Sequence, residues 1–265
     1  MRLERSAVPM ATACSFGGND MIRAVETIVG ALALVIAGVA ASAAQTFTPP
    51  KGCTLSLTVQ MRQCQVANVY SCAGDVPGDR WISYADGVGV YFSSRIDHET
   101  RWMESIDHDS GEIDRLLPKA NDHASFSTLI ATGRDDYDFL TENTGGFVER
   151  FVGVDRLTGE SVMIGGILLE RSTFELSSYD AAGAFLTRRT GTQFISRDLR
   201  LFFGDTEVFE NAAGDRVESF QPPVTFSLPG DEGFGSAKPV FDCNAVLTQA
   251  PSLTDHLRSL RHDQI

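Results

Sequence analysis

The stretch CTLSLTVQMRQC, residues 53–64, decides the expected fold. Apolar and polar side chains alternate in it from Thr54 to Met61. Successive side chains of a strand point to opposite faces, so this period of two is typical of a half-buried β-strand. One face carries Leu55, Leu57, Val59 and Met61, and the other carries Thr54, Ser56, Thr58 and Gln60.

Further strand-like runs, rich in Val, Ile, Phe and Thr, follow this segment. QVANVYSC (65–72) is the expected partner strand, and Asp86-Gly87 is a strong hairpin signal. Gly165-Gly166 interrupts the longest run and indicates a bulge or a sharp bend. Other turn signals are AGDVPGD (73–79), HDSG (108–111), NTGG (143–146), DRLTG (155–159), DAAG (180–183), GD (204–205) and NAAG (211–214).

These runs predict an all-β chain, an antiparallel meander of about nine to eleven strands that forms a barrel or a strongly curved half-barrel. A two-sheet β-sandwich is the alternative. One short helix is expected at 121–133, with Asn121 or Asp122 as N-cap and Gly133 as C-cap. We expect a short lead at 44–52, a single β domain at 53–248, and a C-terminal tail or short helix at 249–265.

A separate segment, MIRAVETIVGALALVIAGVAASAAQ at residues 21–45, precedes this domain. Its apolar run ends in Ala41-Ser42-Ala43, the small-x-small pattern that a signal peptidase cleaves. We expect residues 21–43 to be a signal peptide and residues 1–20 to be a mis-assigned start or a disordered leader. The protein would then be periplasmic or secreted, with no integral membrane span after cleavage. The alternative is anchoring to the inner membrane by the uncleaved segment.

Four cysteines follow the expected cleavage site, namely Cys53, Cys64, Cys72 and Cys243. An even number in an exported protein predicts two disulfides, for which three connectivities are possible. We favour Cys64–Cys72, which would close a short hairpin, together with Cys53–Cys243, which would tie the two ends of the domain together. The spacing lacks a C-x2-C pair and no histidine lies nearby, so we expect no metal site.

The formal net charge of −13 makes the chain strongly acidic. Such a chain lacks the surplus cations that displace counterions from nucleic acid or bind anionic lipid surfaces. We therefore expect no nucleic-acid partner, and we attribute the charge to solubility. The sequence leaves the oligomeric state open.

Two resemblances accompany these patterns. CTLSLTVQMRQCQVANVYSC, ETRWMES, LRLFFG and FDCN together resemble exported bacterial β-rich proteins of unknown function, over most of the chain after residue 43. This resemblance implies no particular activity. Gly78-Asp79-Arg80-Trp81 is similar to the G-x-W motif of lipocalins, with one additional residue before the tryptophan, and implies a lipocalin-like architecture only.

Catalytic and cofactor motifs are weak in this sequence. DHE (97–99) and DHD (107–109) place acids beside histidines, which could raise the basicity of an imidazole, but both triplets fall in expected turns. The run 107–118 departs from a calcium loop, because glycine stands at its fifth position and proline at its twelfth. GDEGFGSAK (230–238) lacks the G-K-[ST] ending of a phosphate-binding loop, and no G-x-S-x-G occurs. We therefore expect no cofactor, metal or catalytic residue, and we favour a binding protein over an enzyme.

Aromatic residues in the expected strands provide a candidate ligand pocket. A barrel of about eight strands or more can enclose one small ligand. We therefore predict an exported, non-enzymatic protein that holds an apolar or amphipathic small molecule inside its sheet. The alternatives are an envelope structural or interaction module with a filled core, and a hydrolase that uses acids and histidines of residues 97–109. The candidate pocket residues are Trp81, Tyr91, Trp102, Phe151 and Phe174.

Overall fold

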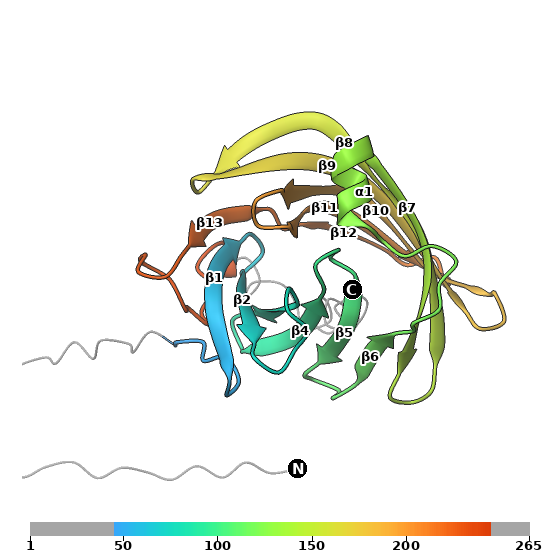
Figure 1. The fold of residues 1–265 in the computed structure, drawn as a ribbon, viewed down its shortest axis with the longest axis horizontal. Helices are drawn as coiled ribbons and strands as arrows, with labels where there is room; N and C mark the ends of the chain where they lie inside the picture. Colours follow the sequence, from blue (N-terminus) through green and yellow to red (C-terminus); the bar gives the residue numbers. More distant parts are fainter. Residues whose placement is uncertain (1–44, 245–265) are drawn as a thin grey trace, which may run out of the picture. The chain divides into compact units, whose positions relative to one another are not determined.

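The computed structural model describes residues 45–244, shown in colour in Figure 1. The expected leader (1–20), signal peptide (21–43) and C-terminal tail (249–265) lie outside the described residues. Within residues 45–244, no helix reaches the length and hydrophobicity that a transmembrane span requires.

The described chain is all-β with one short helix, as predicted. Thirteen strands and the helix α1 (Phe126–Thr132) follow one another along the sequence. The strands are β1 (Cys53–Met61), β2 (Gln65–Cys72), β3 (Arg80–Ala85), β4 (Val90–Ile96), β5 (Trp102–Asp107), β6 (Ile113–Leu116), β7 (Arg134–Asn143), β8 (Val148–Ile164), β9 (Ile167–Asp180), β10 (Phe185–Ser196), β11 (Leu201–Asn211), β12 (Arg216–Phe220) and β13 (Pro223–Ser227).

All thirteen strands belong to a single antiparallel sheet (Figure 1). Each strand from β1 to β11 pairs with the next one in sequence, as a meander requires, and β13 pairs with β1. The sheet is not closed, because β12 and β13 are its two edges and share no ladder. The predicted meander is therefore confirmed, and the alternative of two packed sheets is not what the chain forms.

The predicted number of nine to eleven strands is too low, in part because Gly165-Gly166 divides the longest expected run into two strands. Some of the other turn signals, however, lie inside strands. DRLTG (155–159) lies within β8, where the register to β9 shifts between Leu157 and Ser161. GD (204–205) lies within β11, opposite a second register shift. Both signals mark bulges, which keep the strand running. In contrast, Gly165-Gly166 is the tight turn of the β8–β9 hairpin, not the predicted bulge or bend.

The helix forms where the sequence predicts it, but its N-cap differs. Ser125 is the N-cap, and its side chain accepts a hydrogen bond from the N–H of Thr128. Asn121 and Asp122, the predicted N-caps, lie further upstream. Gly133 is the C-cap as predicted, with a φ of 82° that a residue without a Cβ adopts freely. Phe126 and Leu129 are the buried residues of α1.

Two disulfides form among the four predicted cysteines, but with a different pairing from the favoured one. Cys53 bonds Cys72, directly opposite in the β1–β2 register, and Cys64 bonds Cys243. The favoured Cys64–Cys72 pairing is wrong because the two residues lie at opposite ends of β2: Gln65, next to Cys64, faces Met61, whereas Cys72 faces Cys53.

The segment after β13 covers the polar face of β1, which we expected to be exposed. The Thr58 hydroxyl accepts the N–H of Gly235 at 2.9 Å, and Gln60 Nε2 donates to the carbonyl of Lys238 at 3.0 Å. Thr58 and Gln60 are consequently buried. The second half of β1 is therefore buried on both faces, and the Cys64–Cys243 bond fixes the covering segment.

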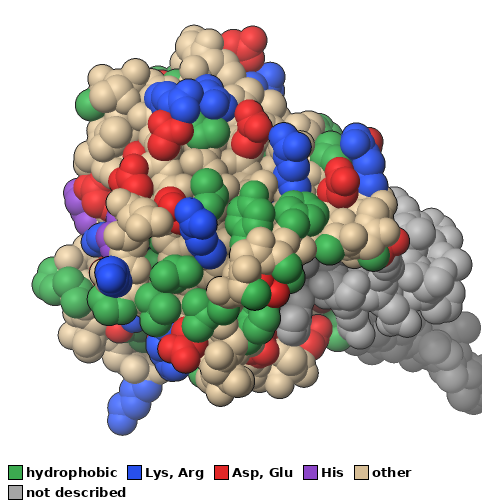
Figure 2. Space-filling model, turned by 90° about the vertical axis from the view of Figure 1, so that its right-hand side faces the viewer, with side chains coloured by type: hydrophobic (Ala, Val, Ile, Leu, Met, Phe, Trp, Pro, Cys, Tyr) green, Lys and Arg blue, Asp and Glu red, His purple; other side chains and the backbone are tan. Residues whose placement is uncertain are grey.

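The outer surface carries mixed charge. On the face in Figure 2, basic and acidic side chains are interspersed, with hydrophobic side chains between them. Many exposed arginines pair with carboxylates, such as Arg134 with Asp136 at 2.5 Å and Arg150 with Asp138 at 2.6 Å. Water screens such exposed pairs, so these contacts balance surface charge more than they stabilise the fold.

Candidate ligand cavity

The concave side of the sheet holds a partly open cavity of about 250 Å³. This volume is just below the range of roughly 300–1,000 Å³ that is usual for small-molecule sites. Side chains from strands β1 to β12 and from α1 line it, so residues far apart in sequence converge there. Its apolar lining includes Ile82, Tyr84, Phe92, Trp102, Leu116, Phe126, Leu129, Phe139, Phe174 and Leu176.

An aromatic cluster forms one part of the cavity wall. The ring of Trp102 meets Phe139 edge-on at a centroid distance of 5.4 Å and Phe151 at 5.7 Å. Phe139 and Phe151 stack at 5.4 Å across β7 and β8, where they are direct register partners. Such contacts hold large apolar side chains in defined orientations, so the wall is preformed.

Some of the predicted pocket residues line the cavity and others do not. Trp102 and Phe174 line the cavity, and Phe151 packs against Trp102 from behind. Trp81 is not a lining residue: its ring stacks on Tyr70, and its Nε1–H donates to Asp75 at 2.9 Å. Tyr91 is buried but does not line the cavity either, since its strand neighbour Phe92 points inward.

Two aspartates, Asp135 and Asp155, lie side by side on this wall. They are direct register partners on β7 and β8, both line the cavity, and their exposed fractions are 6% and 8%. The backbone N–H of Ser125 donates to Asp135 Oδ2 at 2.7 Å, and Gln193 Nε2 donates to Asp155 Oδ1 at 2.7 Å. Neither carboxylate forms an ion pair with any cation in residues 45–244.

The pKa values of both aspartates are high, as their surroundings require. Burial, together with the nearby charge of Asp135, raises the pKa of Asp155 to about 7, and the hydrogen bond from Gln193 only partly offsets this. Burial also raises the pKa of Asp135 to about 6; the Ser125 N–H opposes this, and neighbouring carboxylates add to it. Burial and both aspartates raise the pKa of the adjacent Tyr137 well above 10.

Two glycines near the acidic pair allow neighbouring atoms to approach the backbone closely. Gly153 faces Tyr137 across the β7–β8 ladder, and an added Cβ would lie 2.4 Å from Tyr137 Cε2. Only a residue without a side chain leaves room for the tyrosine ring beside the two aspartates. Gly191 is equally confined, because an added Cβ would lie 1.9 Å from the backbone oxygen of Thr206.

The remaining charged residues of the cavity have partners. Arg189 lies 3.6 Å from Glu207 and also sits over the ring of Phe209. Arg101 pairs with Asp97 at 2.5 Å. Asp205 accepts the hydroxyl of Thr192 at 2.8 Å and lies 3.4 Å from Arg171. Among the ionised groups of the lining, the Asp135–Asp155 pair is therefore the one whose charge the described residues leave uncompensated.

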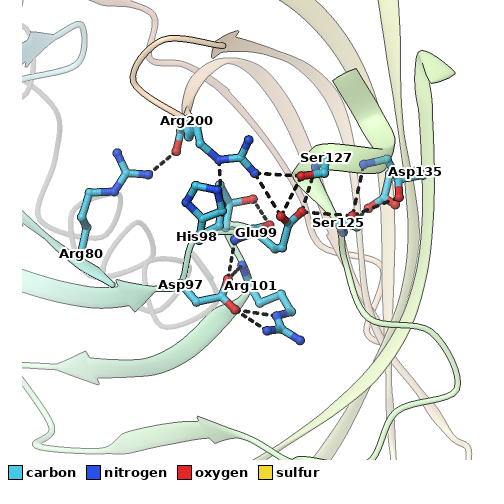
Figure 3. Close-up of polar contacts among 11 residues, drawn as sticks. Arg80, Asp97, His98, Glu99, Arg101, Ser125, Ser127, Asp135 and Arg200 are labelled. Atoms are coloured by element: carbon cyan, nitrogen blue, oxygen red, sulfur yellow. Dashed lines mark hydrogen bonds and ion pairs between the residues drawn. The ribbon is translucent and has the colours of Figure 1, made fainter. Parts of the chain in front are cut away.

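Helix α1 covers part of the cavity and is fixed in place by Glu99 (Figure 3). The Glu99 carboxylate accepts the N–H of Ser127 at 2.8 Å, the Ser127 hydroxyl at 2.7 Å and the Ser125 hydroxyl at 3.1 Å. Although burial acts to raise the pKa of Glu99, these bonds and the charge of Arg200 together lower it. Because Ser125 also donates to Asp135, α1 is linked directly to the acidic pair.

Arg200 completes this attachment (Figure 3). Its guanidinium donates to the carbonyl of His98 at 2.9 Å and to Glu99 Oε1 at 3.2 Å, and it lies over the ring of Phe126. Arg80 in turn donates to the backbone carbonyls of Leu199 and Arg200. The β4–β5 loop, the β10–β11 loop and α1 are thus joined in one polar network.

The acids and histidines of residues 97–109 do not converge on the cavity. His98 and His108 are exposed, and neither is a lining residue. His108 Nε2 lies 2.8 Å from the Ser93 hydroxyl, and Asp107 accepts the N–H of Ser110 in an ordinary turn. No group of His, Cys, Asp and Glu side chains suited to a metal ion occurs among the described residues.

No family model, curated protein or solved structure gives a significant match to this chain. The G-x-W-like stretch leads into β3, where Trp81 bonds Asp75 on the outside of the cavity wall. The function proposed below therefore rests on the cavity and on the chemistry of its lining.

Proposed function

We propose that this protein is an exported, non-enzymatic binder that holds an apolar or amphipathic small molecule inside its curved sheet. The observation that carries the proposal is the cavity of about 250 Å³, which has an aromatic wall and a few convergent polar groups. That combination is typical of sites that bury most of a small ligand and orient it through a small number of polar contacts.

The cavity also distinguishes this proposal from a structural or interaction module with a filled core. Protein interiors are close-packed, and voids larger than a water molecule are few because each one forfeits dispersion contacts. Here the large side chains of Tyr84, Phe92 and Trp102 border the cavity. A ligand that fills this space would restore the lost contacts.

Export is supported from two directions. Residues 21–43 have the pattern of a signal peptide, which places the protein in the periplasm or outside the cell, or on the inner membrane if the segment is not cleaved. The two disulfides are consistent with an oxidising compartment, where such bonds persist. A small molecule held there would be carried, stored or sequestered in the envelope.

Native mass spectrometry of the full chain, exported with its own leader and purified from the periplasm, tests the proposal. We expect an added mass that organic solvent releases. The variant Leu116→Trp fills the cavity and should lack this mass, whereas Leu168→Trp, an exposed position beside the β8–β9 turn, should keep it.

Direct binding of n-octanol provides the second readout. The unmodified protein and Leu168→Trp should bind octanol with one site, and Leu116→Trp should bind it at least tenfold more weakly. A bare chain that also fails to bind octanol, or an added mass that persists in Leu116→Trp, would contradict the proposal.

A further inference from the structure

Asp135 and Asp155 place two buried carboxyl groups directly opposite each other without a cation between them. Like charges that face each other across two strands destabilise a sheet, and burial increases the cost. Elsewhere this chain pairs its carboxylates with arginine, as it does for Asp136 and Asp138 on the outward face of the same strand. The uncompensated pair on the inward face therefore has a charge requirement that a ligand could meet.

The register places the pair in one row with an aromatic residue of the cavity lining. Asp135 faces Asp155, which faces Phe174 on β9, which faces Gly191 on β10. At Gly191 the backbone oxygen of Thr206 takes the place of a side chain, and Gly153 leaves room beside the pair for Tyr137. A compact group bound at the two carboxylates would thus have the Phe174 ring next to it in the same row, and aromatic faces attract cations.

A second, independent feature of the cavity also points to a ligand. Gln65 on β2 lines the cavity and is only 1% exposed, yet its Nε2 has no hydrogen-bond partner among residues 45–244. A buried amide donor without an acceptor is unfavourable, because it has lost its hydrogen bond to water and gained none in return. Because buried polar groups are nearly always hydrogen-bonded, an oxygen of a bound molecule or of a water in the cavity would satisfy this donor.

We propose that Asp135 and Asp155 bind the protonated nitrogen of an amphipathic amine, whose apolar part lies against the aromatic wall of Trp102, Phe139 and Phe174. This inference rests on the proposed ligand-holding function and adds the ligand class. Two carboxylates match an ammonium group, which offers three hydrogen-bond donors and one positive charge. Gln65 Nε2 would meet an oxygen elsewhere on the same ligand or a water bound with it.

Three probes with the same alkyl chain test the ligand class. n-Octylamine, n-octanol and n-octanoate are titrated into the full protein by calorimetry at pH 8, where both carboxyl groups are largely ionised. Since a charge-assisted hydrogen bond contributes about 1.5–3 kcal/mol, octylamine should bind about ten- to a hundredfold more tightly than octanol. Octanoate should bind more weakly than octanol, because the pair repels its carboxylate.

The double variant Asp135→Asn/Asp155→Asn removes both charges and keeps the oxygens that accept Ser125 N–H and Gln193 Nε2–H. In this variant, octylamine and octanol should bind within about threefold of each other. The matched control is Asp136→Asn/Glu175→Gln, which removes two charges from exposed positions on the neighbouring strands and should keep the amine preference.

A pH comparison on the unaltered protein keeps the test decisive if the double variant does not fold. Octylamine stays protonated throughout, since a simple alkyl amine titrates near pH 10. At pH 5 both aspartates bind protons, so the amine preference should fall to about threefold or less. The other titratable or charged groups near the pair are Glu99, Asp122 and His123 from the adjoining loops, Tyr137 and the outward-facing Asp136 from β7, and Arg101, Arg189, Asp205 and Glu207 from the cavity lining.

The possible outcomes distinguish the amine assignment from the proposed ligand-binding function. Equal binding of octanol and octylamine at pH 8, tighter binding of octanoate, or an amine preference that survives the loss of both carboxylates would overturn the amine assignment and leave the binding function intact. Failure of all three probes to bind would overturn both. Octylamine preference that is lost in the double variant, or at pH 5, supports both.

Discussion

Replacing Asp155 with asparagine is expected to stabilise the ligand-free protein at pH 8 and to change its stability little at pH 4. Burial and the charge of Asp135 raise the pKa of Asp155 to about 7 in the folded state, whereas the ordinary value is 3.8. Between these two values the folded protein keeps a proton that the unfolded chain has released. The free energy of unfolding therefore falls as the pH rises through this window, and asparagine, which does not ionise, escapes the loss.

The size of the effect follows from the same two pKa values. A pKa of about 7 in place of 3.8 corresponds to about 4 kcal/mol at pH 8, because one pKa unit is worth about 1.4 kcal/mol. We expect about 2–4 kcal/mol, since water entering the cavity would solvate part of the charge. Asparagine retains the oxygen that accepts Gln193 Nε2–H at 2.7 Å, so the substitution creates no new void and loses no hydrogen bond.

Urea denaturation between pH 4 and pH 8, with the disulfides intact, measures the effect. The stability difference between Asp155→Asn and the unaltered protein should grow across this range and level off above about pH 7. Asp136→Asn, at an exposed position on the adjacent strand β7, is the control. The ion pair with Arg134 lowers the pKa of Asp136, so its loss should be slightly destabilising at pH 8, which is the opposite sign. Parallel pH profiles for the unaltered protein and Asp155→Asn would refute the reasoning.

Three further predictions concern the disulfides, the helix attachment and the glycine beside the acidic pair. Peptide mapping without reduction should recover the Cys53–Cys72 and Cys64–Cys243 bonds, and recovery of a Cys64–Cys72 peptide would contradict the structure. Removing the Cys64–Cys243 bond, which spans 179 residues, should lower the free energy of unfolding by up to about 5 kcal/mol. Removing the Cys53–Cys72 bond, which spans 19 residues, should lower it by about 3 kcal/mol. Glu99→Gln removes the charge that accepts Ser125 and Ser127, so amide hydrogen exchange of residues 126–132 should become faster, whereas Glu160→Gln on the exposed part of β8 should leave it unchanged. Gly153→Ala should lower the free energy of unfolding by about 1–3 kcal/mol, because the new Cβ would lie 2.4 Å from Tyr137 Cε2 and 2.6 Å from the backbone oxygen of Glu175. Thermal or urea unfolding measures this loss, and an unchanged midpoint would show that the tyrosine ring is free to move.

The sequence predicts the elements of this fold because each has a local cause. The alternation from Thr54 to Met61 reflects the pleat of β1, and Gly133 ends α1 by adopting a φ that other residues avoid. Asp86-Gly87 lies in the β3–β4 turn for the same local reason, where the Asp86 side chain accepts two backbone N–H groups. Such features depend on neighbours within a few residues, which a single sequence contains.

The features that the sequence does not predict depend on register. DRLTG (155–159) has a turn composition, but pairing with β9 keeps it in a strand as a bulge. The disulfide pairing follows from the β1–β2 register, which sets Cys53 opposite Cys72. Of the expected pocket residues, Trp81, Tyr91 and Phe151 do not line the cavity, and the strand neighbour Phe92 lines it in place of Tyr91. Register is a long-range property, and composition does not report it.

The acidic pair shows why such a site is easily missed and why it is informative once seen. In the sequence, Asp135 stands in RDDYDFL, where three acids suggest a solvated surface, and Asp155 stands in an apparent turn. Alternation places Asp135 on the face of Tyr137 and Phe139, which is the apolar side, and the register with β8 then brings Asp155 to meet it. A shift of one residue would have put Asp155 opposite Arg134 or Asp136 and dispersed the pair. The chain also has arginines in the same strands, which it uses for the outward acids Asp136 and Asp138. Without a cation beside them, the inward acids Asp135 and Asp155 reduce the stability of the fold at neutral pH. A cationic ligand in the cavity would reverse that loss, because the attraction that binds the ligand also neutralises the two carboxylates.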